Sequence, residues 1–511
     1  MRITAAQGSE SLWAEVREHM ADAPSFCGGR GSCGKCKVRV IEGRASVSAA
    51  DRRHLTEEEI AAGFRIACAS IPLTDCVIET GDIGEERLQV LTGVDGCGAL
   101  STGRDGYSIA IDIGTTTLAF ALLDREGSVA ALETGLNHQR RFGADVVSRI
   151  AYAMNGHGEE LTACIRSDIR QGIMRLMERG GIGLSKVGHI VVAGNTAMEQ
   201  LFFGISVEGL GSYPFLPYTG DFLRAEYGQL FHGSEYWEQG AERLGITGFP
   251  CIAGFVGGDI TAGLYELTAE QGREASLFLD IGTNGELACL HDGRILTAST
   301  AAGPVFEGGN ISCGMACLPG AICAVQRIGD QLECTTVEGG SPRGLCGSGL
   351  IEAVAELLKL GIVDRSGQML SQWRERGYVL ARGADGRHIA LTQQDIREFQ
   401  MAKAAIAAGT ELLLGRAGLE AGKLPEILLA GGLGNGLSVR KAVSVGLLPK
   451  GAERRVCFVG NTSLKGAIKL LREKTYEEGE DRIRKMLACT GHIHLANREE
   501  FGEAYIRHMG F

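Results

Sequence analysis

Two stretches decide the fold: Ala110-Ile111-Asp112-Ile113-Gly114-Thr115-Thr116-Thr117 and Phe278-Leu279-Asp280-Ile281-Gly282-Thr283-Asn284-Gly285. Each is a short apolar run of strand-forming residues that stops at an aspartate and turns on a glycine. Each then re-enters an apolar strand, at residues 118–123 in the first copy and 286–290 in the second. The repetition predicts two similar halves within one chain.

Each of these turns suits a phosphate group. Glycine lets the backbone bend tightly and approach a ligand closely, because it has no side chain. The amides of such a turn, together with threonine hydroxyls, form a concave set of donors for phosphate oxygens. The aspartate repels phosphate but can hold a hydrated Mg²⁺ that bridges to it. The residues predicted to form these two phosphate turns are Asp112, Gly114, Thr115, Thr116, Thr117, Asp280, Gly282, Thr283, Asn284 and Gly285.

A third glycine-rich stretch lies downstream, Ile427-Leu428-Leu429-Ala430-Gly431-Gly432-Leu433-Gly434-Asn435, and a helix is expected over 437–445. A backbone without side chains at Gly431, Gly432 and Gly434 would let adenine or ribose lie flat against it. The order of the three turns resembles the superfamily of acetate kinase, sugar kinases, Hsp70 and actin. That resemblance implies two similar α/β halves with a nucleotide between them. The alternative is an ordinary α/β protein whose strand ends are marked by glycines.

Further stretches are predicted to line the cleft. Asp259 follows paired glycines. In kinases of the superfamily an aspartate near this place acts as a base or holds Mg²⁺. The alternative is that Asp259 is the N-cap of the next helix. Gly347 and Ser348 begin a helix whose amides could face the nucleotide. Lys403, on a helix expected over 395–414, is predicted to point at the nucleotide.

Three other polar or glycine-rich segments look like parts of the same site. Residues 137–146 are densely polar and lead into a helix carrying Arg149, as a wall of a site would, and 302–315 brings more glycines to the cleft. Gly194-Asn195-Thr196 ends a buried strand and is echoed by Gly460-Asn461-Thr462, as a duplicated fold would require.

The N-terminal segment has a different chemistry. Cys27, Cys33 and Cys36 lie in a glycine-rich loop at C-x5-C-x2-C spacing, and Cys68 follows in Arg65-Ile66-Ala67-Cys68. A structural zinc site usually pairs two short cysteine knuckles, and this segment has one. A [2Fe–2S] cluster takes three thiolates from one loop and a fourth from afar. The segment resembles a [2Fe–2S] ferredoxin domain, which favours Cys68 as the last ligand, with Cys76 as a competitor.

Composition bounds the remaining choices. A net charge of −11 with no long basic block argues against nucleic-acid binding. The chain shows neither a signal peptide nor an apolar run long enough to cross a bilayer, so a cytoplasmic location is expected. Most of the 16 cysteines read as buried small residues, and the spacings of Cys313, Cys317 and Cys323 match no usual metal site.

The expected domain division follows from these segments. Residues 1–85 form an α+β ferredoxin-like domain of the β-grasp type, and 86–106 form a linker. A duplicated α/β actin-like ATPase with ribonuclease H-like halves follows. Its first half covers 107–274, with an insertion near 205–250, and its second half covers 275–511.

The combination resembles one family, the ATP-dependent reductive activators of corrinoid proteins. The likeness covers the cluster loop, both phosphate turns, 254–263, 303–315 and 431–435. It implies an enzyme that couples ATP to electron transfer from a [2Fe–2S] cluster held by Cys27, Cys33, Cys36 and Cys68. The acceptor would be an inactive Co(II) corrinoid protein of a methyltransferase system, which returns to Co(I).

The implied cofactors are the cluster, ATP and Mg²⁺, and the implied partners are the corrinoid protein and a low-potential electron donor, with room for a homodimer. Two other functions stay open. One is ATP-driven activation of a different low-potential enzyme, and the other is a redox sensor in which the cluster controls an ATPase switch.

Overall fold

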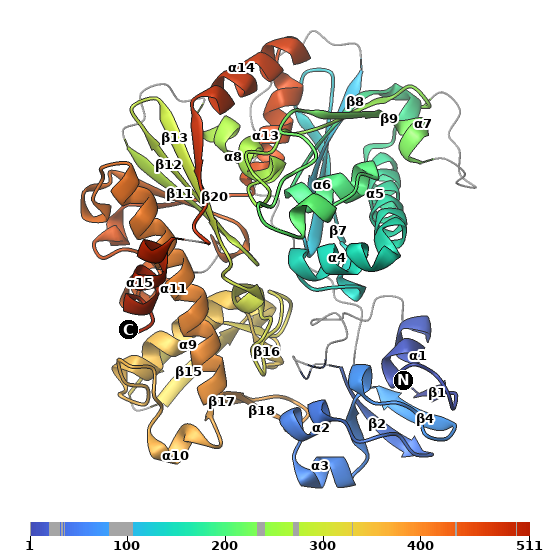
Figure 1. Cartoon of the computed structure of the whole chain (residues 1–511), viewed down its shortest axis with the longest axis vertical. Coiled ribbons are helices and arrows are strands. Elements are labelled where there is room, and N and C mark those ends of the chain that lie inside the picture. The colour runs from blue at the N-terminus through green and yellow to red at the C-terminus, as the bar shows by residue number, and fades with distance from the viewer. Residues whose placement is uncertain are drawn as a thin grey trace.

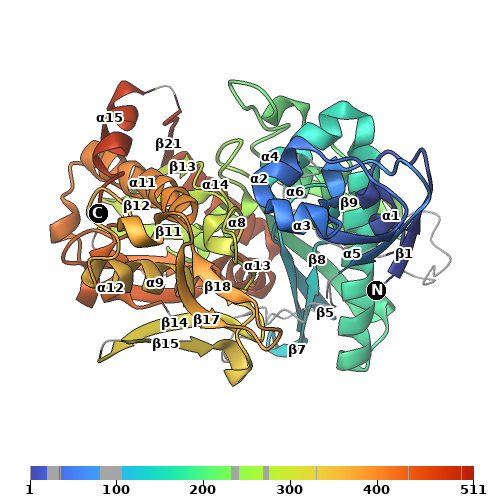
Figure 2. The same ribbon diagram turned by 90° about the horizontal axis from the view of Figure 1, so that it is seen from below.

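The computed structural model describes residues 2–19, 31, 34, 36–80, 106–231, 241–268, 275–329, 331–434, 437–496 and 498–511. These residues form three units along the chain: a small N-terminal unit and two larger halves, each built on a six-stranded sheet (Figure 1). Figure 1 places the N-terminal unit below the first half, and in Figure 2, seen from below, it lies in front of that half.

The N-terminal unit is an antiparallel sheet in the order β1-β4-β2-β3 with three helices. Its elements are β1 (Arg2–Ala5), α1 (Leu12–His19), β2 (Lys37–Glu42), α2 (Ala49–His54), α3 (Glu57–Ala61), β3 (Phe64–Ile66) and β4 (Cys76–Thr80). Ser48 and Thr56 begin α2 and α3 with reciprocal capping boxes, which satisfy backbone donors at both helix starts. The opening strand has four residues, so this edge of the sheet is short.

The first half is built on a mixed sheet in the order β7-β6-β5-β8-β10-β9. Its strands are β5 (Tyr107–Ile113), β6 (Thr117–Leu123), β7 (Val129–Leu136), β8 (Val187–Gly194), β9 (Leu223–Glu226) and β10 (Gly245–Gly248). Its helices are α4 (Val146–Tyr152), α5 (Gly158–Gly180), α6 (Thr196–Phe203), α7 (Tyr227–Leu230) and α8 (Gly258–Leu267). The stretch expected to be an insertion near 205–250 therefore supplies two strands, β9 and β10, to this sheet.

The second half repeats the same pattern. Its sheet has the order β20-β19-β11-β12-β13-β21, with the strands β11 (Ser276–Ile281), β12 (Gly285–His291), β13 (Arg294–Thr300), β19 (Glu426–Ala430), β20 (Val456–Gly460) and β21 (Thr490–Ile493). In both halves an antiparallel three-stranded meander is followed by two strands parallel to its first strand. β8 pairs with β5 and β10 pairs with β8 in the first sheet, and β19 pairs with β11 and β20 with β19 in the second. The predicted duplication is confirmed.

Further elements complete the second half. A three-stranded sheet of β14 (Ala321–Ile328), β15 (Gln331–Thr336) and β16 (Gly344–Leu345) and a hairpin of β17 (Tyr378–Arg382) and β18 (His388–Leu391) lie below its main sheet (Figure 1). Its helices are α9 (Gly347–Lys359), α10 (Ser371–Arg374), α11 (Gln393–Arg416), α12 (Val439–Ser444), α13 (Thr462–Arg472), α14 (Tyr476–Ala488) and α15 (Glu499–Arg507).

Two helices, α8 and α13, lie where the halves meet. Ala262 and Tyr265 of α8 pack in the core against the first sheet, whereas Ile260 and Leu264 of the same helix pack against the second. The crossing of α8 and α13 is close, because a β-carbon added to Gly466 would lie 2.0 Å from the carbonyl oxygen of Ala262. All strands of the first sheet precede residue 275 and all strands of the second follow it. However, α13 and α14, from the last part of the chain, pack on the first sheet.

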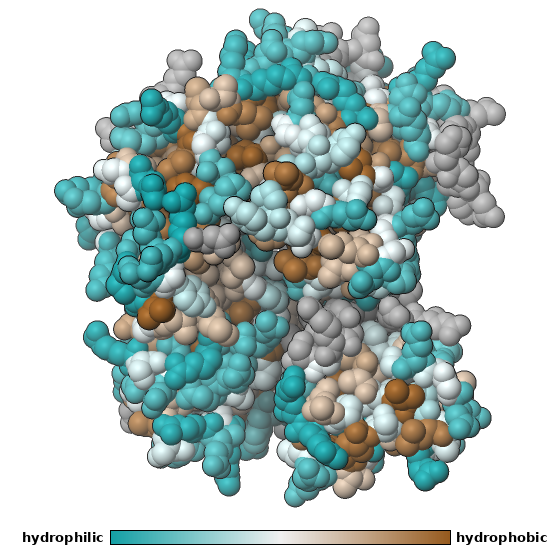
Figure 3. Space-filling model, viewed as in Figure 1, coloured by the Kyte–Doolittle hydropathy of each residue, from teal (hydrophilic) through white to brown (hydrophobic). Residues whose placement is uncertain are grey.

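The surface carries apolar patches among hydrophilic side chains, including brown areas on the N-terminal unit (Figure 3). The large apolar side chains of that unit that are exposed are Val47, Ile71 and Leu73. Within the ranges described above, no helix is both long enough and apolar enough to span a bilayer.

Candidate functional site

The first phosphate turn, between β5 and β6, is held by two polar side chains, Arg149 and Asn137. Arg149 is fully buried, and its guanidinium donates to the carbonyl oxygens of Thr115 (2.5 Å) and Gly143 (2.9 Å). Asn137 Nδ2 donates to the carbonyl oxygen of Gly114 at 2.9 Å. Burial lowers the pKa of Arg149 to about 10, which leaves it charged at neutral pH. The polar stretch predicted to wall the site therefore fixes the backbone of this turn.

The two copies of the Gly-Asn-Thr motif both reach this turn. Asn195 caps α6 and donates from Nδ2 to Thr115 Oγ1 at 3.3 Å. Asn461 caps α13 and donates from Nδ2 to Asp112 Oδ2 at 2.7 Å, and Ser463 Oγ donates to Asp112 Oδ1 at 2.7 Å. Both oxygens of Asp112 thus accept hydrogen bonds from a segment about 350 residues later in the chain.

The second and third turns lie side by side because β11 and β19 are parallel neighbours, with Asp280 paired to Ala430. Gly431 follows directly with a φ of 83°, which favours glycine. A β-carbon added to it would lie 2.6 Å from Asp280 Oδ1. The predicted adenosine turn and the second phosphate turn therefore form one surface that requires glycine.

The start of α9 joins this surface. A β-carbon on Gly347 would lie 2.0 Å from the carbonyl oxygen of Phe306 and 2.9 Å from Leu433 Cδ2, in the third turn. Gly347 therefore lies beside the third turn. Gly432–Gly434 form a 3₁₀ turn.

A glutamate joins the two phosphate turns. Thr116 Oγ1, from the first turn, donates to Glu307 Oε2 at 2.8 Å, and Thr283 Oγ1, from the second, donates to Glu307 Oε1 at 2.7 Å. The two turns, one from each half, thus contact the same half-buried carboxylate. The structure brings the two predicted phosphate sites together.

The cleft concentrates acidic groups whose pKa values are raised. Burial raises the pKa of Asp280 to about 7, with the negative charges of Asp112 and Glu307 adding to it. Burial and the charge of Asp280 likewise raise the pKa of Asp259, and burial raises those of Asp112 and Glu286. Carboxylates held this close favour a bound cation, because a cation relieves their mutual repulsion.

This acidic set is not a closed metal cage. Over the residues whose placement is described, no group of three or more histidine, cysteine, aspartate or glutamate side chains is arranged to hold a metal ion.

Asp259 and Lys403 have different neighbours: Asp259 lies near the other acidic groups, whereas Lys403 contacts the end of the chain. Gly257 is the N-cap of α8, so Asp259 lies one position inside the helix and faces the other cleft acids, which excludes the N-cap alternative. Lys403 instead donates from its ammonium group to the carbonyl oxygen of Gly510 and lies over the ring of Phe511, 5.1 Å from its centre. The C-terminal residues are thus the observed neighbours of Lys403, where the sequence predicted a nucleotide.

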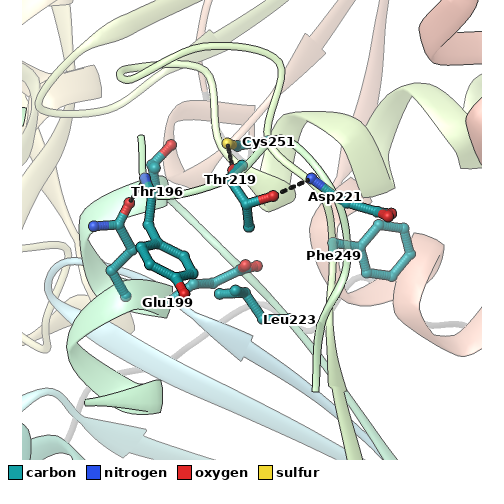
Figure 4. A pocket seen from close by; sticks show the side chains of 9 residues that line it. Thr196, Glu199, Thr219, Asp221, Leu223, Phe249 and Cys251 are labelled. Carbon is teal, nitrogen blue, oxygen red and sulfur yellow. Dashed lines mark hydrogen bonds between the residues drawn. The ribbon is translucent and has the colours of Figure 1, made fainter. Parts of the chain in front are cut away.

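A small pocket lies beside Thr196 of the first Gly-Asn-Thr motif (Figure 4). Glu199 and Thr196 of α6 line it opposite Thr219, Asp221 and other residues of the loops beside β9 and β10. Burial raises the pKa of Glu199 well above its usual value, and the nearby charge of Asp259 adds to the effect. Glu199 therefore lies between this pocket and the acidic cleft.

The N-terminal unit contains two of the four predicted cluster ligands within the described residues; Cys27 and Cys33 lie outside them. The amide of Cys68 donates to Cys36 Sγ at 3.4 Å, so the two cysteines are neighbours. Cys76 is buried in β4 and donates to the carbonyl oxygens of Arg44 and Thr74. An amide directed at a thiolate is the kind of bond that stabilises an iron–sulfur cluster, so Cys36 and Cys68 fit the predicted group.

A buried aspartate fixes the segment that carries Cys68. Asp51, in α2, accepts hydrogen bonds from the amide of Ile66 at 2.5 Å and from Ser70 Oγ at 3.0 Å. The segment between these two residues contains Cys68 and is therefore tied to α2 at both ends.

Sequence reasoning missed several members of the site. Glu307 lies in the stretch 302–315 that was predicted to reach the cleft, but it was not singled out there, and neither were Glu286 and Glu199. Asn461 and Ser463 lie in a motif that was noticed only as an echo of the first. The two copies end strands at different places: Gly194 ends β8, which pairs with β5, whereas Gly460 ends β20, which pairs with β19 at the edge of the second sheet. The echo by itself therefore gave no sign that Asn461 would reach Asp112.

Comparisons with known proteins agree with this architecture. Family models match at residues 274–511 (C-terminal domain of RACo, the ASKHA domain), 107–271 (RACo middle region) and 1–73 (2Fe-2S iron-sulfur cluster binding domain). The corrinoid activation enzyme RamQ of Eubacterium limosum is 29% identical over 95% of this chain and 93% of its own length.

Two more proteins are similar over most of the chain. The [Co(II) methylated amine-specific corrinoid protein] reductase of Methanosarcina barkeri is 28% identical, over 79% of this chain and 77% of that protein. The solved structure of a reductive activator for a corrinoid iron–sulfur protein matches with a TM-score of 0.70 and 27% identity, over 99% of this chain and 96% of that one. The chain belongs to the family of ATP-dependent reductive activators of corrinoid proteins, with a [2Fe–2S] ferredoxin domain followed by an actin-like ATPase.

Proposed function

We propose that this protein uses ATP to drive one electron from its [2Fe–2S] cluster to the Co(II) centre of an inactive corrinoid protein, which restores Co(I) for methyl transfer. One observation carries the proposal: a single chain joins a pair of neighbouring cysteines of the cluster type to two similar halves, whose predicted phosphate turns contact the same glutamate. The relatives named above, which act on corrinoid proteins, support the choice of acceptor.

The pairing of a ferredoxin with an ATPase has an energetic reason. An electron that moves downhill needs no ATP. Plant-type clusters lie near about −400 mV, and the Co(II)/Co(I) couple of a corrinoid can lie lower still. Nucleotide binding can favour a state of the complex in which cobalt is easier to reduce, provided that the two states bind the nucleotide differently.

Different residues of the site would bind the phosphates, the adenosine and the Mg²⁺ of the nucleotide. The amides and hydroxyls of the two phosphate turns would donate to phosphate oxygens, and Gly431, Gly432, Gly434, Gly347 and Ser348 would leave room for adenosine. Asp112, Asp280 and Asp259 would hold a hydrated Mg²⁺ beside the phosphates, which neutralises charge. Their raised pKa values support this role, because buried carboxyls with no cation resist ionisation.

The cysteines would complete the electron path. We assign Cys27, Cys33, Cys36 and Cys68 as the ligands of the cluster, which supplies one-electron chemistry. In the described part of the chain no cysteine forms a disulfide, which suits a reducing compartment, and we place the protein in the cytoplasm.

The test is anaerobic absorption spectroscopy of a Co(II) corrinoid protein from the same organism, mixed with this protein and a low-potential reductant, with and without ATP. A Co(I) band that requires both ATP and this protein is the expected result. An intact [2Fe–2S] spectrum and a working ATPase without Co(I) would contradict the proposal. That outcome would favour activation of a different low-potential enzyme, or a sensor in which the redox state of the cluster changes ATP binding.

A further inference from the structure

Glu307 holds the position that the sequence argument assigns to phosphate. The hydroxyls of Thr116 and Thr283 were expected to donate to phosphate oxygens, and both donate to the carboxylate of Glu307, at 2.8 and 2.7 Å. The two threonines come from different halves of the chain. One carboxylate therefore satisfies a pair of donors that a nucleotide would otherwise have to bridge.

The chain fixes this carboxylate in place. Glu307 ends a 3₁₀ turn (Pro304–Glu307) whose Val305 and Phe306 are buried, and Gly308 follows with a φ of 80°. A β-carbon on Gly308 would lie 2.4 Å from the carbonyl oxygen of Met315, so the backbone after Glu307 is closely packed. Glu307 thus reaches the two hydroxyls from a packed support rather than from a free loop.

Carboxylate and phosphate compete for the same donors. Both are oxyanions that accept charge-assisted hydrogen bonds of similar length from hydroxyl groups. They also repel each other, so a phosphate cannot take the two threonine hydroxyls while Glu307 remains between them. The negative charge of Glu307 acts to raise the pKa of Arg149 and that of Asp280, so Glu307 lies near both groups of the polar site.

We propose that Glu307 is an internal competitor of the terminal phosphate of ATP: in the nucleotide-free protein it bridges the two phosphate turns, and the terminal phosphate displaces it from Thr116 and Thr283. This inference rests on the proposed ATP site. It adds that part of the binding energy of ATP is used to release a carboxylate that links the halves. ADP, which lacks the third phosphate, leaves the bridge in place.

The test is calorimetric binding of a non-hydrolysable ATP analogue, AMP-PNP, and of ADP, each with Mg²⁺, to the full-length protein and its variants. In Glu307→Ala and in the isosteric Glu307→Gln the internal anion is gone, so AMP-PNP should bind about tenfold tighter, the effect of losing one charged hydrogen-bond competitor. ADP should change by less than about twofold by the same argument. Glu333→Gln, an exposed glutamate on β15, is the control for loss of one negative charge.

Substitution of the threonines should change the affinity for AMP-PNP in the opposite direction. Thr283→Val removes a donor that the phosphate needs, so it should weaken AMP-PNP binding, and in a Thr116→Val/Thr283→Val background Glu307→Ala should bring no gain. If Glu307→Ala tightens AMP-PNP binding by itself but not when both threonines are valine, then Glu307 and the threonines are directly coupled. An unchanged cluster spectrum and melting temperature identify the variants that are correctly folded.

The outcomes separate the two proposals. If the unmodified protein binds no adenine nucleotide, the proposed function fails. If it binds AMP-PNP but both Glu307 variants bind it no more tightly, the competitor role is wrong while the ATP site stands. An equal gain for ADP would also overturn the assignment, because the competition would then involve an inner phosphate.

Discussion

Asn461 Nδ2 donates to Asp112 Oδ2 at 2.7 Å, across 349 positions of sequence. Asn461 also accepts from the amide of Leu464 at 2.8 Å, so one side chain both begins α13 and holds the first phosphate turn. The C-terminal segment thereby sets the direction of an aspartate in the first half. A movement of α13 relative to β5 must change this contact.

The first prediction concerns this contact. Asn461→Ala removes one hydrogen bond from Asp112 and one helix cap, so it should lower the free energy of unfolding by about 1–2 kcal/mol. Asn461→Asp keeps a capping side chain but places a second negative charge against Asp112, so it should reduce ATPase activity more than Asn461→Ala does. Chemical denaturation and steady-state ATPase assays measure the two effects. Greater activity in Asn461→Asp than in Asn461→Ala would mean that Asp112 is not a negatively charged group in the working site.

The cleft acids predict a pH-dependent stability in the absence of metal and nucleotide. The pKa of Asp280 is raised to about 7, so between about pH 4 and pH 7 the folded chain keeps a proton that the unfolded chain has lost. The free energy of unfolding must then fall as pH rises through this window. Asp280→Asn cannot ionise, so its stability should fall less over the same range.

This prediction is measured as melting temperature against pH, in EDTA. Asp481→Asn, an exposed aspartate on α14, is the matched control and should keep the slope of the unmodified protein. Addition of Mg²⁺ with nucleotide should flatten the slope, because a cation stabilises the ionised carboxylates. A slope that is the same in Asp280→Asn and in the unmodified protein would contradict the assignment of this group.

The sequence predicted those parts of the site whose chemistry is local. A strand that ends in Asp-Ile-Gly-Thr carries its own turn, so both phosphate turns and the glycine at position 431 were recognisable without a structure. The duplication was recognisable for the same reason. Each of these features depends on residues within about ten positions of each other.

The remaining features depend on contacts between distant residues. Glu307 contacts Thr116 across 191 positions; the stretch 302–315 was predicted to reach the cleft, but its local pattern does not indicate which of its residues contacts the phosphate turns. Lys403 lies on the predicted helix, but its contact with the last residues of the chain, 107 positions away, could not be predicted from the helix alone. The packing of α13 and α14 on the first sheet likewise follows from topology and not from local pattern.

The fourth cluster ligand is a choice between Cys68 and Cys76, and the structure gives them different neighbours. Cys68 lies against Cys36, whereas Cys76 is buried in β4 with its thiol directed at two backbone carbonyl groups. Cys68→Ala should therefore lose the visible absorbance and the iron of the cluster, and Cys76→Ala should keep both. Both variants should bind ATP as the unmodified protein does, since the cleft lies in the other units. Loss of iron in Cys76→Ala with retention in Cys68→Ala would reverse the assignment.

Gly431 and Gly451 offer a matched pair for the last prediction. Both have a left-handed backbone, with φ of 83° and 84°, but a β-carbon on Gly431 would lie 2.6 Å from Asp280 Oδ1, whereas nothing lies within 4 Å of one on Gly451. An alanine costs about 1–2 kcal/mol at either position for its backbone conformation. Only Gly431→Ala must also displace the carboxylate of Asp280.

Gly431→Ala should therefore lower the melting temperature more than Gly451→Ala does and should weaken ATP binding by at least about tenfold, since it disturbs the second and third turns together. Gly451→Ala should leave ATP affinity within about twofold of the unmodified protein. Calorimetric titration with AMP-PNP and a thermal melt measure both properties on the same samples. Equal affinity in the two variants would show that the close approach of Gly431 to Asp280 has no part in nucleotide binding, and the third turn would have to be assigned another role.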